Sequence, residues 1–159
     1  MEIQELLASY FDGYDELQDI LRDMPIEMWD FKPGPDKWSV REIIIHLLDC
    51  EVNSYVRFRK IIAENGSTVM PYDQNKWAIH LNYSAQSIDT SLELFKYLRL
   101  INFTLFKDIP SEAWNNYMMH PERGKISLYE HLQETTEHVG IHIKQMKRNF
   151  EYWQKFKSN

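Results

Sequence analysis

The chain has 159 residues, of which 43% are hydrophobic and 26% charged, so it can bury a core of its own and lacks the composition of disordered or fibrous proteins. A net charge of −6 argues against binding to nucleic acids or anionic membranes, because either partner would require a basic face. No apolar run is long enough to span a membrane, the N-terminus is acidic and unlike a signal peptide, and the one cysteine excludes an internal disulfide, so we expect a single cytoplasmic domain over residues 1–159.

Two helices are predicted in the N-terminal part of the chain. Over residues 3–23, apolar side chains recur at helical spacing, namely Ile3, Leu6, Leu7, Tyr10, Tyr14, Leu17 and Leu21. The linker 25–38 contains three prolines and two tryptophans, which favours a segment folded over one end of the domain. Ser39 and Glu42 then form a capping box, which predicts a second helix that runs to about Asn65.

Three polar residues of this second helix lie on or beside its apolar face. His46 lies at the edge of the apolar arc, and Cys50 follows one turn later. Cys50 could be a metal ligand, but a small buried thiol at the edge of a core is the favoured interpretation. Glu51 falls inside the arc, where a carboxylate must be paired, hydrogen-bonded or protonated. It is therefore either a partner of a metal-bound histidine or a structural anchor for a loop.

The middle of the chain predicts a long crossover. Residues 66–86 show no sustained period, and a connection of this length can carry the chain back along a four-helix bundle. A third helix is predicted over residues 88–108, followed by a loop to residue 126. We therefore expect an all-α four-helix bundle with long connecting loops, in which the helices run up-down-down-up with a crossover between helices two and three.

The last helix is predicted over residues 127–156, and it carries the candidate site. Ser127 and Glu130 form a second capping box at its start. His138 and His142 are one turn apart, so their ring nitrogens can converge on one ion. His131 shares their stripe but lies about 10.5 Å below His138, too far to share the ion, although it can line the site.

Each of these features also has a purely structural interpretation. A histidine at the edge of an apolar face is commonly a hydrogen-bonded structural residue. Glu134, Gln145 and Tyr152 share the histidine stripe, where they either support ligands or form a polar border. Four aromatic residues either line a pocket or cap the ends of the core, namely Trp38, Tyr72, Trp77 and Trp114.

The chain resembles a known family in two motifs. The first is Trp38–Ile43 (WSVREI) leading to His46 and Glu51, and the second is the L-x-E-H-L start of the last helix leading to His138, His142, Gln145 and Met146. Both motifs, together with Pro71, Tyr72 and Trp77 in the crossover, resemble the DinB-like four-helix bundles, which include the YfiT-type proposed hydrolases and the bacillithiol S-transferases.

The resemblance implies a metal site and a range of activities. It places three metal-binding histidines at His46, His138 and His142, with a divalent ion, Zn²⁺ or Ni²⁺, open to substrate. Cys50 and His131 are outside the family motif. The favoured function is metal-dependent transfer of a low-molecular-weight thiol, of the bacillithiol type, to an electrophile.

Two other functions stay open from the sequence. One is a metal-dependent hydrolase, and the other is a non-catalytic bundle that binds a metal or another ligand. The expected partners are a small-molecule thiol or a hydrolysable substrate, and a homodimer is among the assemblies that we consider. No catalytic residue beyond the metal ligands can be assigned, because no Ser-His-Asp arrangement is recognisable.

Overall fold

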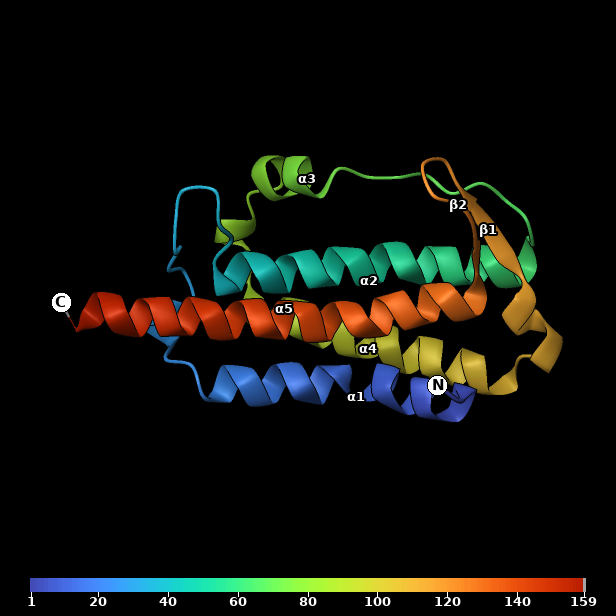
Figure 1. The fold of residues 1–159 in the computed structure, drawn as a ribbon, viewed down its shortest axis with the longest axis horizontal. Coiled ribbons are helices and arrows are strands. Elements are labelled where there is room, and N and C mark those ends of the chain that lie inside the picture. The colour runs from blue at the N-terminus through green and yellow to red at the C-terminus, as the bar shows by residue number, and fades with distance from the viewer. Residues whose placement is uncertain (159) are drawn as a thin grey trace.

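Four long helices form the body of the molecule in the computed structural model, which describes residues 1–158 (Figure 1). These are α1 (Ile3–Arg22), α2 (Val40–Ala63), α4 (Ile88–Asp108) and α5 (Leu128–Lys157). α1 and α5 run in one direction along the bundle, and α2 and α4 run in the other. The predicted four-helix bundle, with parallel second and third long helices, is confirmed. Within residues 1–158, no helix combines the length and the apolarity that a membrane crossing requires.

Capping boxes start the helices that carry the candidate site. The Ser39 side chain accepts a hydrogen bond from the Glu42 amide, and the Glu42 carboxylate accepts one from the Ser39 amide. Ser127 and Glu130 make the same reciprocal pair at the start of α5. Both predicted caps are therefore confirmed, and they fix the first turns of α2 and α5.

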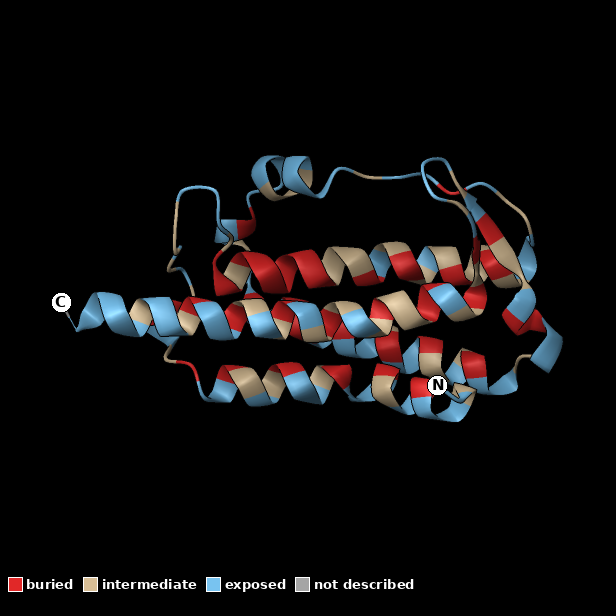
Figure 2. Ribbon diagram, viewed as in Figure 1, coloured by how far each residue is buried: buried red, intermediate tan, exposed pale blue. Residues whose placement is uncertain are grey.

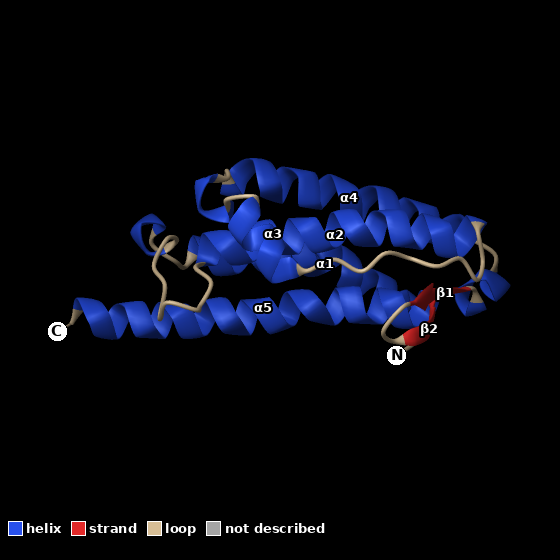
Figure 3. Ribbon diagram, turned by 90° about the horizontal axis from the view of Figure 1, so that it is seen from above, coloured by secondary structure: helices blue, strands red, loops and turns tan. Residues whose placement is uncertain are grey.

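The two long connections contain short elements that the sequence pattern did not predict. The crossover between α2 and α4 carries α3 (Gln74–His80), which begins where the Asp73 carboxylate accepts bonds from two backbone amides. The connection before α5 forms an antiparallel hairpin of β1 (Tyr117–His120) and β2 (Gly124–Ser127). Figure 3 shows the crossover passing beside the bundle from the hairpin end to the opposite end. A small sheet is thus added to the predicted helical fold.

Two apolar clusters fill the bundle, one toward each end. The first contains Leu17, Ile43, Leu92, Val139 and Met146 among others, and the second contains Leu6, Phe58, Phe106, Trp114 and Leu132 among others. Figure 2 shows buried positions along the faces that the long helices turn toward one another. Because all four long helices contribute to this core, the bundle packs through apolar burial along most of its length.

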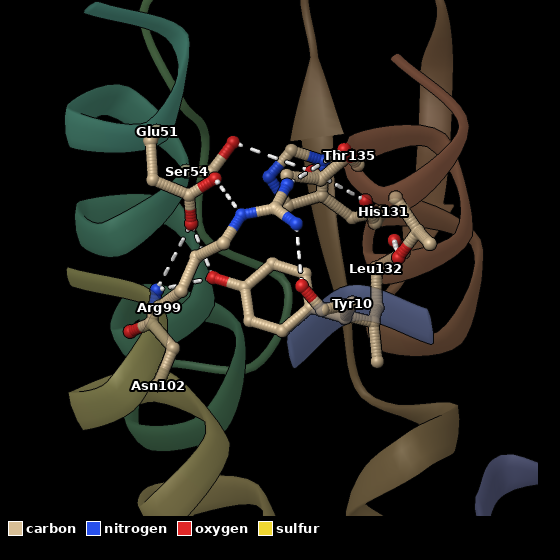
Figure 4. A network of polar contacts seen from close by, with 9 residues as sticks. Tyr10, Glu51, Ser54, Arg99, Asn102, His131, Leu132 and Thr135 are labelled. Carbon is tan, nitrogen blue, oxygen red and sulfur yellow. Dashed lines mark hydrogen bonds and ion pairs between the residues drawn. The ribbon is translucent and has the colours of Figure 1, made fainter. Parts of the chain in front are cut away.

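A layer of buried polar residues separates the two clusters (Figure 4). Arg99 of α4 is 1% exposed, and its Nε donates to the Glu51 carboxylate of α2 at 3.1 Å. The Tyr10 hydroxyl of α1 also donates to Glu51, and the Asn102 amide nitrogen donates to the Tyr10 hydroxyl at 3.0 Å. These bonds satisfy the buried carboxylate, as its position in the apolar arc required.

Arg99 also connects α4 to the helix that carries two of the histidines. Its Nη2 donates to the carbonyl of Thr135 at 3.3 Å, one turn before His138. Its Nη1 donates to the carbonyl of Tyr10 in α1, where Gly13 leaves the necessary space because a Cβ at Gly13 would collide with Nη1. Of the two roles predicted for Glu51, its contacts are those of a structural anchor, and they hold helices rather than a loop.

Candidate metal centre

Three histidine side chains from two helices converge near the middle of the bundle. His46 of α2 has its Nε2 atom 3.3 Å from Nε2 of His138 in α5, although the two residues are 92 positions apart. His142 has its Nε2 atom 2.9 Å from the same nitrogen of His138. The ring centroids of His46 and His142 lie 4.8 Å apart. The three residues singled out in the sequence therefore lie together, with Nε2 of His46 and Nε2 of His142 both beside Nε2 of His138.

Two of the separations between these nitrogens fit a single divalent ion, those of His46 and of His142 from His138. Imidazole nitrogens that bind Zn²⁺ at about 2.0–2.1 Å in tetrahedral geometry lie about 3.3 Å from one another. The observed separations of 3.3 and 2.9 Å are close to that value. Three protein ligands leave a further coordination position for a substrate, which is the pattern of catalytic metal sites. That His46, His138 and His142 bind a metal stays a prediction.

A glutamine sets the tautomer of one imidazole. Gln145 lies one turn after His142 on α5, and its Oε1 atom is 2.9 Å from Nδ1 of His142. Because a carbonyl oxygen only accepts hydrogen bonds, Nδ1 carries the proton and Nε2 keeps its lone pair. Metal-binding histidines usually donate their second ring nitrogen to such a partner. This contact favours the supporting role for Gln145 over a polar border.

Burial keeps the three imidazoles uncharged at neutral pH. Desolvation, followed by repulsion from the neighbouring histidines, lowers the pKa of His46 to about 3. The same causes, joined by Arg99, lower the pKa of His138 to about 4, and desolvation lowers the pKa of His142 as well. Neutral imidazole is the form that binds a metal. The three histidines therefore need not lose protons before a metal ion binds.

Cys50 and Tyr72 lie beside the histidines. The Cys50 Sγ atom is 3.5 Å from Nε2 of His46 and 2.7 Å from the hydroxyl of Tyr72 in the crossover. His46, Cys50 and His138 offer ligand atoms that all lie within 4.8 Å of one another. Burial raises the pKa of the Cys50 thiol to about 12, so it is protonated at neutral pH. The sequence favoured a packing role for Cys50, whereas the structure also leaves its thiol within reach of the site.

The aromatic residues named from the sequence divide between the two roles. Trp38 packs against the ring of His46, with centroids 4.6 Å apart, and Trp77 packs against Tyr72 at the same distance. Trp38 and Tyr72 therefore lie beside the site, and Trp77 packs behind Tyr72. Trp114 lies in an apolar cluster far along the bundle and caps the core.

Within residues 1–158, two polar residues of the histidine stripe make no hydrogen bond to His46, His138 or His142. Glu134 is engaged in an ion pair with Arg123, and Tyr152 is largely exposed near the C-terminus. For Tyr152 the polar border is the better interpretation, whereas Glu134 also lines the pocket beside the histidines.

A pocket of about 400 Å³ opens beside the histidines. It is lined by His138, Cys50 and Tyr72, and by His131, which the sequence predicted as a lining residue. Arg57 also lines the pocket and was missed in the sequence, although a wheel places it about 20° from His46. A second hollow, of about 530 Å³, is lined by Trp38 and residues of the linker and α3 but includes no histidine. The smaller pocket is therefore the candidate substrate site.

Comparison with known proteins agrees with the fold. The family model of the DinB superfamily matches residues 12–146. The chain belongs to the DinB superfamily. An Oceanobacillus iheyensis relative, whose name proposes a metal-dependent hydrolase, is 30% identical over 142 residues, which are 87% of this chain and 82% of that protein. A Bacillus cereus relative with the same proposed activity is 30% identical over 114 residues, and the match spans only 65% of its length.

Solved structures of other proteins share this architecture. YfiT from Bacillus subtilis, proposed as a metal-dependent hydrolase with an unusual four-helix bundle topology, matches with a TM-score of 0.80 at 20% identity, covering 93% of this chain and 89% of that one. The mycothiol-dependent maleylpyruvate isomerase matches with a TM-score of 0.73 at 13% identity, covering 92% of this chain and 61% of that one. At these identities the likeness concerns the fold alone.

Proposed function

We propose that this DinB superfamily protein is a metal-dependent enzyme that transfers a low-molecular-weight thiol to an electrophile. In this proposal His46, His138 and His142 hold one divalent ion, Zn²⁺ or Ni²⁺. The convergence of their Nε2 atoms supports the metal site. When bound, the ion would lower the pKa of a coordinated thiol, so that the thiolate is the form present at neutral pH.

The state of the nearby carboxylates favours thiol transfer over hydrolysis. Each carboxylate that flanks Cys50 or lines the pocket already accepts a bond from another side chain. These pairs are Asp49 with Tyr83, Glu51 with Arg99, Glu134 with Arg123, and Glu137 with Gln133. Cleavage of an ester or amide benefits from a free general acid that protonates the leaving group, whereas displacement of a halide by a thiolate needs no such acid. This observation carries the proposal.

The chain's own residues position the reactants. The Gln145 carbonyl oxygen orients His142, and Trp38 packs on His46, so both imidazoles are held before substrate arrives. Substrate approaches through the pocket lined by His138 and Tyr72. With monobromobimane as electrophile, the thiol sulfur forms the new S–C bond, bromide leaves with the electron pair of the C–Br bond, and the thiol proton passes to solvent.

The test is the rate of thiol conjugation by metal-loaded protein. We expect it to accelerate the reaction of monobromobimane with small thiols, at a rate that depends on which thiol is offered. Replacement of any one of the three histidines by alanine should remove the acceleration together with most of the metal. Cys50→Ala should retain both, because three histidines already hold the ion. Wild-type protein that is fully loaded with metal but does not accelerate conjugation would overturn thiol transfer.

Hydrolysis is the second candidate, because the Oceanobacillus and Bacillus cereus relatives are named for it. Thiol-independent cleavage of an ester or amide by the same metal-loaded protein would establish it. A protein that binds metal and turns over neither class of substrate would be a ligand-binding bundle.

A further inference from the structure

One side chain in the candidate substrate pocket has an unused hydrogen-bonding atom. His131 lines the pocket and is only 5% exposed, and its Nε2 atom is buried without a hydrogen-bond partner among residues 1–158. Ser54 and Thr135, drawn with His131 in Figure 4, line the same pocket, and their hydroxyls bond to each other and to the His131 backbone carbonyl rather than to its ring. A buried polar atom without a partner costs about 1–3 kcal/mol, so its position favours a partner that arrives with a ligand.

A cation next to His131 is also without an anionic partner. Arg57 of α2 lines the same pocket, and its Nη2 donates to the backbone carbonyl of Met70 at 3.0 Å. Within residues 1–158, no carboxylate lies within ion-pairing distance of Arg57. The other lining arginine, Arg123, is already paired with Glu134. Of the two arginines that line the pocket, Arg57 is therefore the one whose charge is available to a ligand.

The electrostatics at His131 agree with an anion site. Burial, together with the positive charges of Arg57, Arg123 and His120, lowers the pKa of His131 to about 3. The ring is thus neutral at neutral pH and can donate one N–H bond. Glu134 and Glu137 also line the pocket, but both already accept hydrogen bonds, so Arg57 is the lining charge that favours an anion. Carboxylate oxygens accept such bonds from imidazole and guanidinium together, and a charge-assisted bond is shorter and stronger than a neutral one.

We propose that this pocket binds a substrate that carries a carboxylate, with Arg57 and His131 as the residues that recognise it. The inference rests on the proposed function only in assigning that carboxylate to the molecule that reacts beside His138. The apolar part of the substrate would then contact Ile141 and Tyr72, which line the same pocket. Arg57 and His131 would select the substrate without taking part in the bond change.

The test compares two thiols that differ only in the carboxylate. Binding of N-acetylcysteine and of N-acetylcysteine amide is measured by isothermal titration calorimetry, with metal-loaded protein and with metal-free protein. We expect the acid to bind about tenfold or more tightly than the amide in both forms. Arg57→Gln should abolish this preference, and His131→Phe should reduce it, whereas His131→Gln, which keeps a donor, should retain more of it.

Arg148→Gln is the matched control, because it removes the same charge from an exposed position outside the pocket. It should keep the preference of the wild type, and circular dichroism of each variant should show an intact bundle. Equal binding of the acid and the amide by the wild type, or an unchanged preference in Arg57→Gln, would overturn the inference. If the wild-type protein binds no metal but still prefers the acid, the proposed function is wrong and the carboxylate site is supported.

Discussion

Arg99 of α4 and Glu51 of α2 form an ion pair inside the bundle, with Nε 3.1 Å from Oε2 and side chains that are 2% and 1% exposed. The pair lies between the two apolar clusters, and Arg99 bonds onward to the carbonyls of Tyr10 and Thr135. Three helices are thus tied to α4 by one guanidinium, next to the turn of α5 that leads to His138. Two ions removed from water are stable here only because each meets its partner.

The first prediction concerns the loss of one member of this pair. Arg99→Met should lower the free energy of unfolding by about 3–5 kcal/mol, because it leaves the Glu51 charge buried without its cation. Urea denaturation at neutral pH measures the effect. Adding Glu51→Gln to Arg99→Met should recover part of the loss, since the unpaired charge is then removed. A loss below about 1 kcal/mol for Arg99→Met would contradict this account.

A second prediction tests the partner of His142. Gln145→Leu should weaken metal binding about 10–100-fold, because Nδ1 of His142 loses the acceptor that fixes its tautomer and orientation. Competition with a chromogenic chelator gives the affinity. Gln133→Leu is the control, since Gln133 on the same helix bonds only to Glu137 and should leave metal affinity unchanged. Equal affinities for the Gln145 variant and the wild type would remove Gln145 from the site.

Removal of metal forms the third prediction. Chelation should lower the melting temperature while helical circular dichroism at room temperature persists, because the two apolar clusters and the polar layer hold the bundle without an ion. The Ala variant of His138 should melt like the chelated wild type and show no further shift when chelator is added. Complete loss of helix on chelation would show that the ion is required for folding.

The fourth prediction follows from the lowered pKa of His131, which is about 3. The unfolded chain takes up this proton below its ordinary pKa of about 6.5, whereas the folded protein does not, so the free energy of unfolding falls as the pH drops below that value. Between pH 7 and pH 5, His131 alone should account for a loss of about 2 kcal/mol. Urea denaturation at both pH values should therefore show a smaller loss in His131→Gln than in the wild type.

His46 and His138 contribute in the same direction, so the variant should still lose some stability at pH 5. The informative quantity is the difference between the two proteins. The same loss in both would mean that His131 is protonated equally easily in the folded and unfolded states.

The long helices were predictable because each contains several turns of periodic apolar residues and two begin with a capping box. Helix α3 and the hairpin were missed because seven and four residues are too few for a periodic pattern. Helical spacing brought His138 and His142 together, whereas the convergence of His46 with them was implied by the resemblance to the DinB-like family. The sequence showed that Glu51 needs a partner but did not identify that partner. Arg99 lies 48 positions away in the sequence, and a helical pattern does not distinguish a buried arginine from an exposed one.

The space left by Gly13 has a consequence for sequence variation. The side chain of Arg99 occupies the volume that any other residue at position 13 would need for its Cβ. The two positions should therefore vary together, since Arg99 in its observed position leaves room only for glycine opposite it, and a larger residue at position 13 becomes acceptable once the residue at position 99 is shorter. Among relatives, we expect glycine at position 13 wherever position 99 is arginine. Alanine or a larger residue at position 13 should occur only in relatives in which the arginine at position 99 has been replaced.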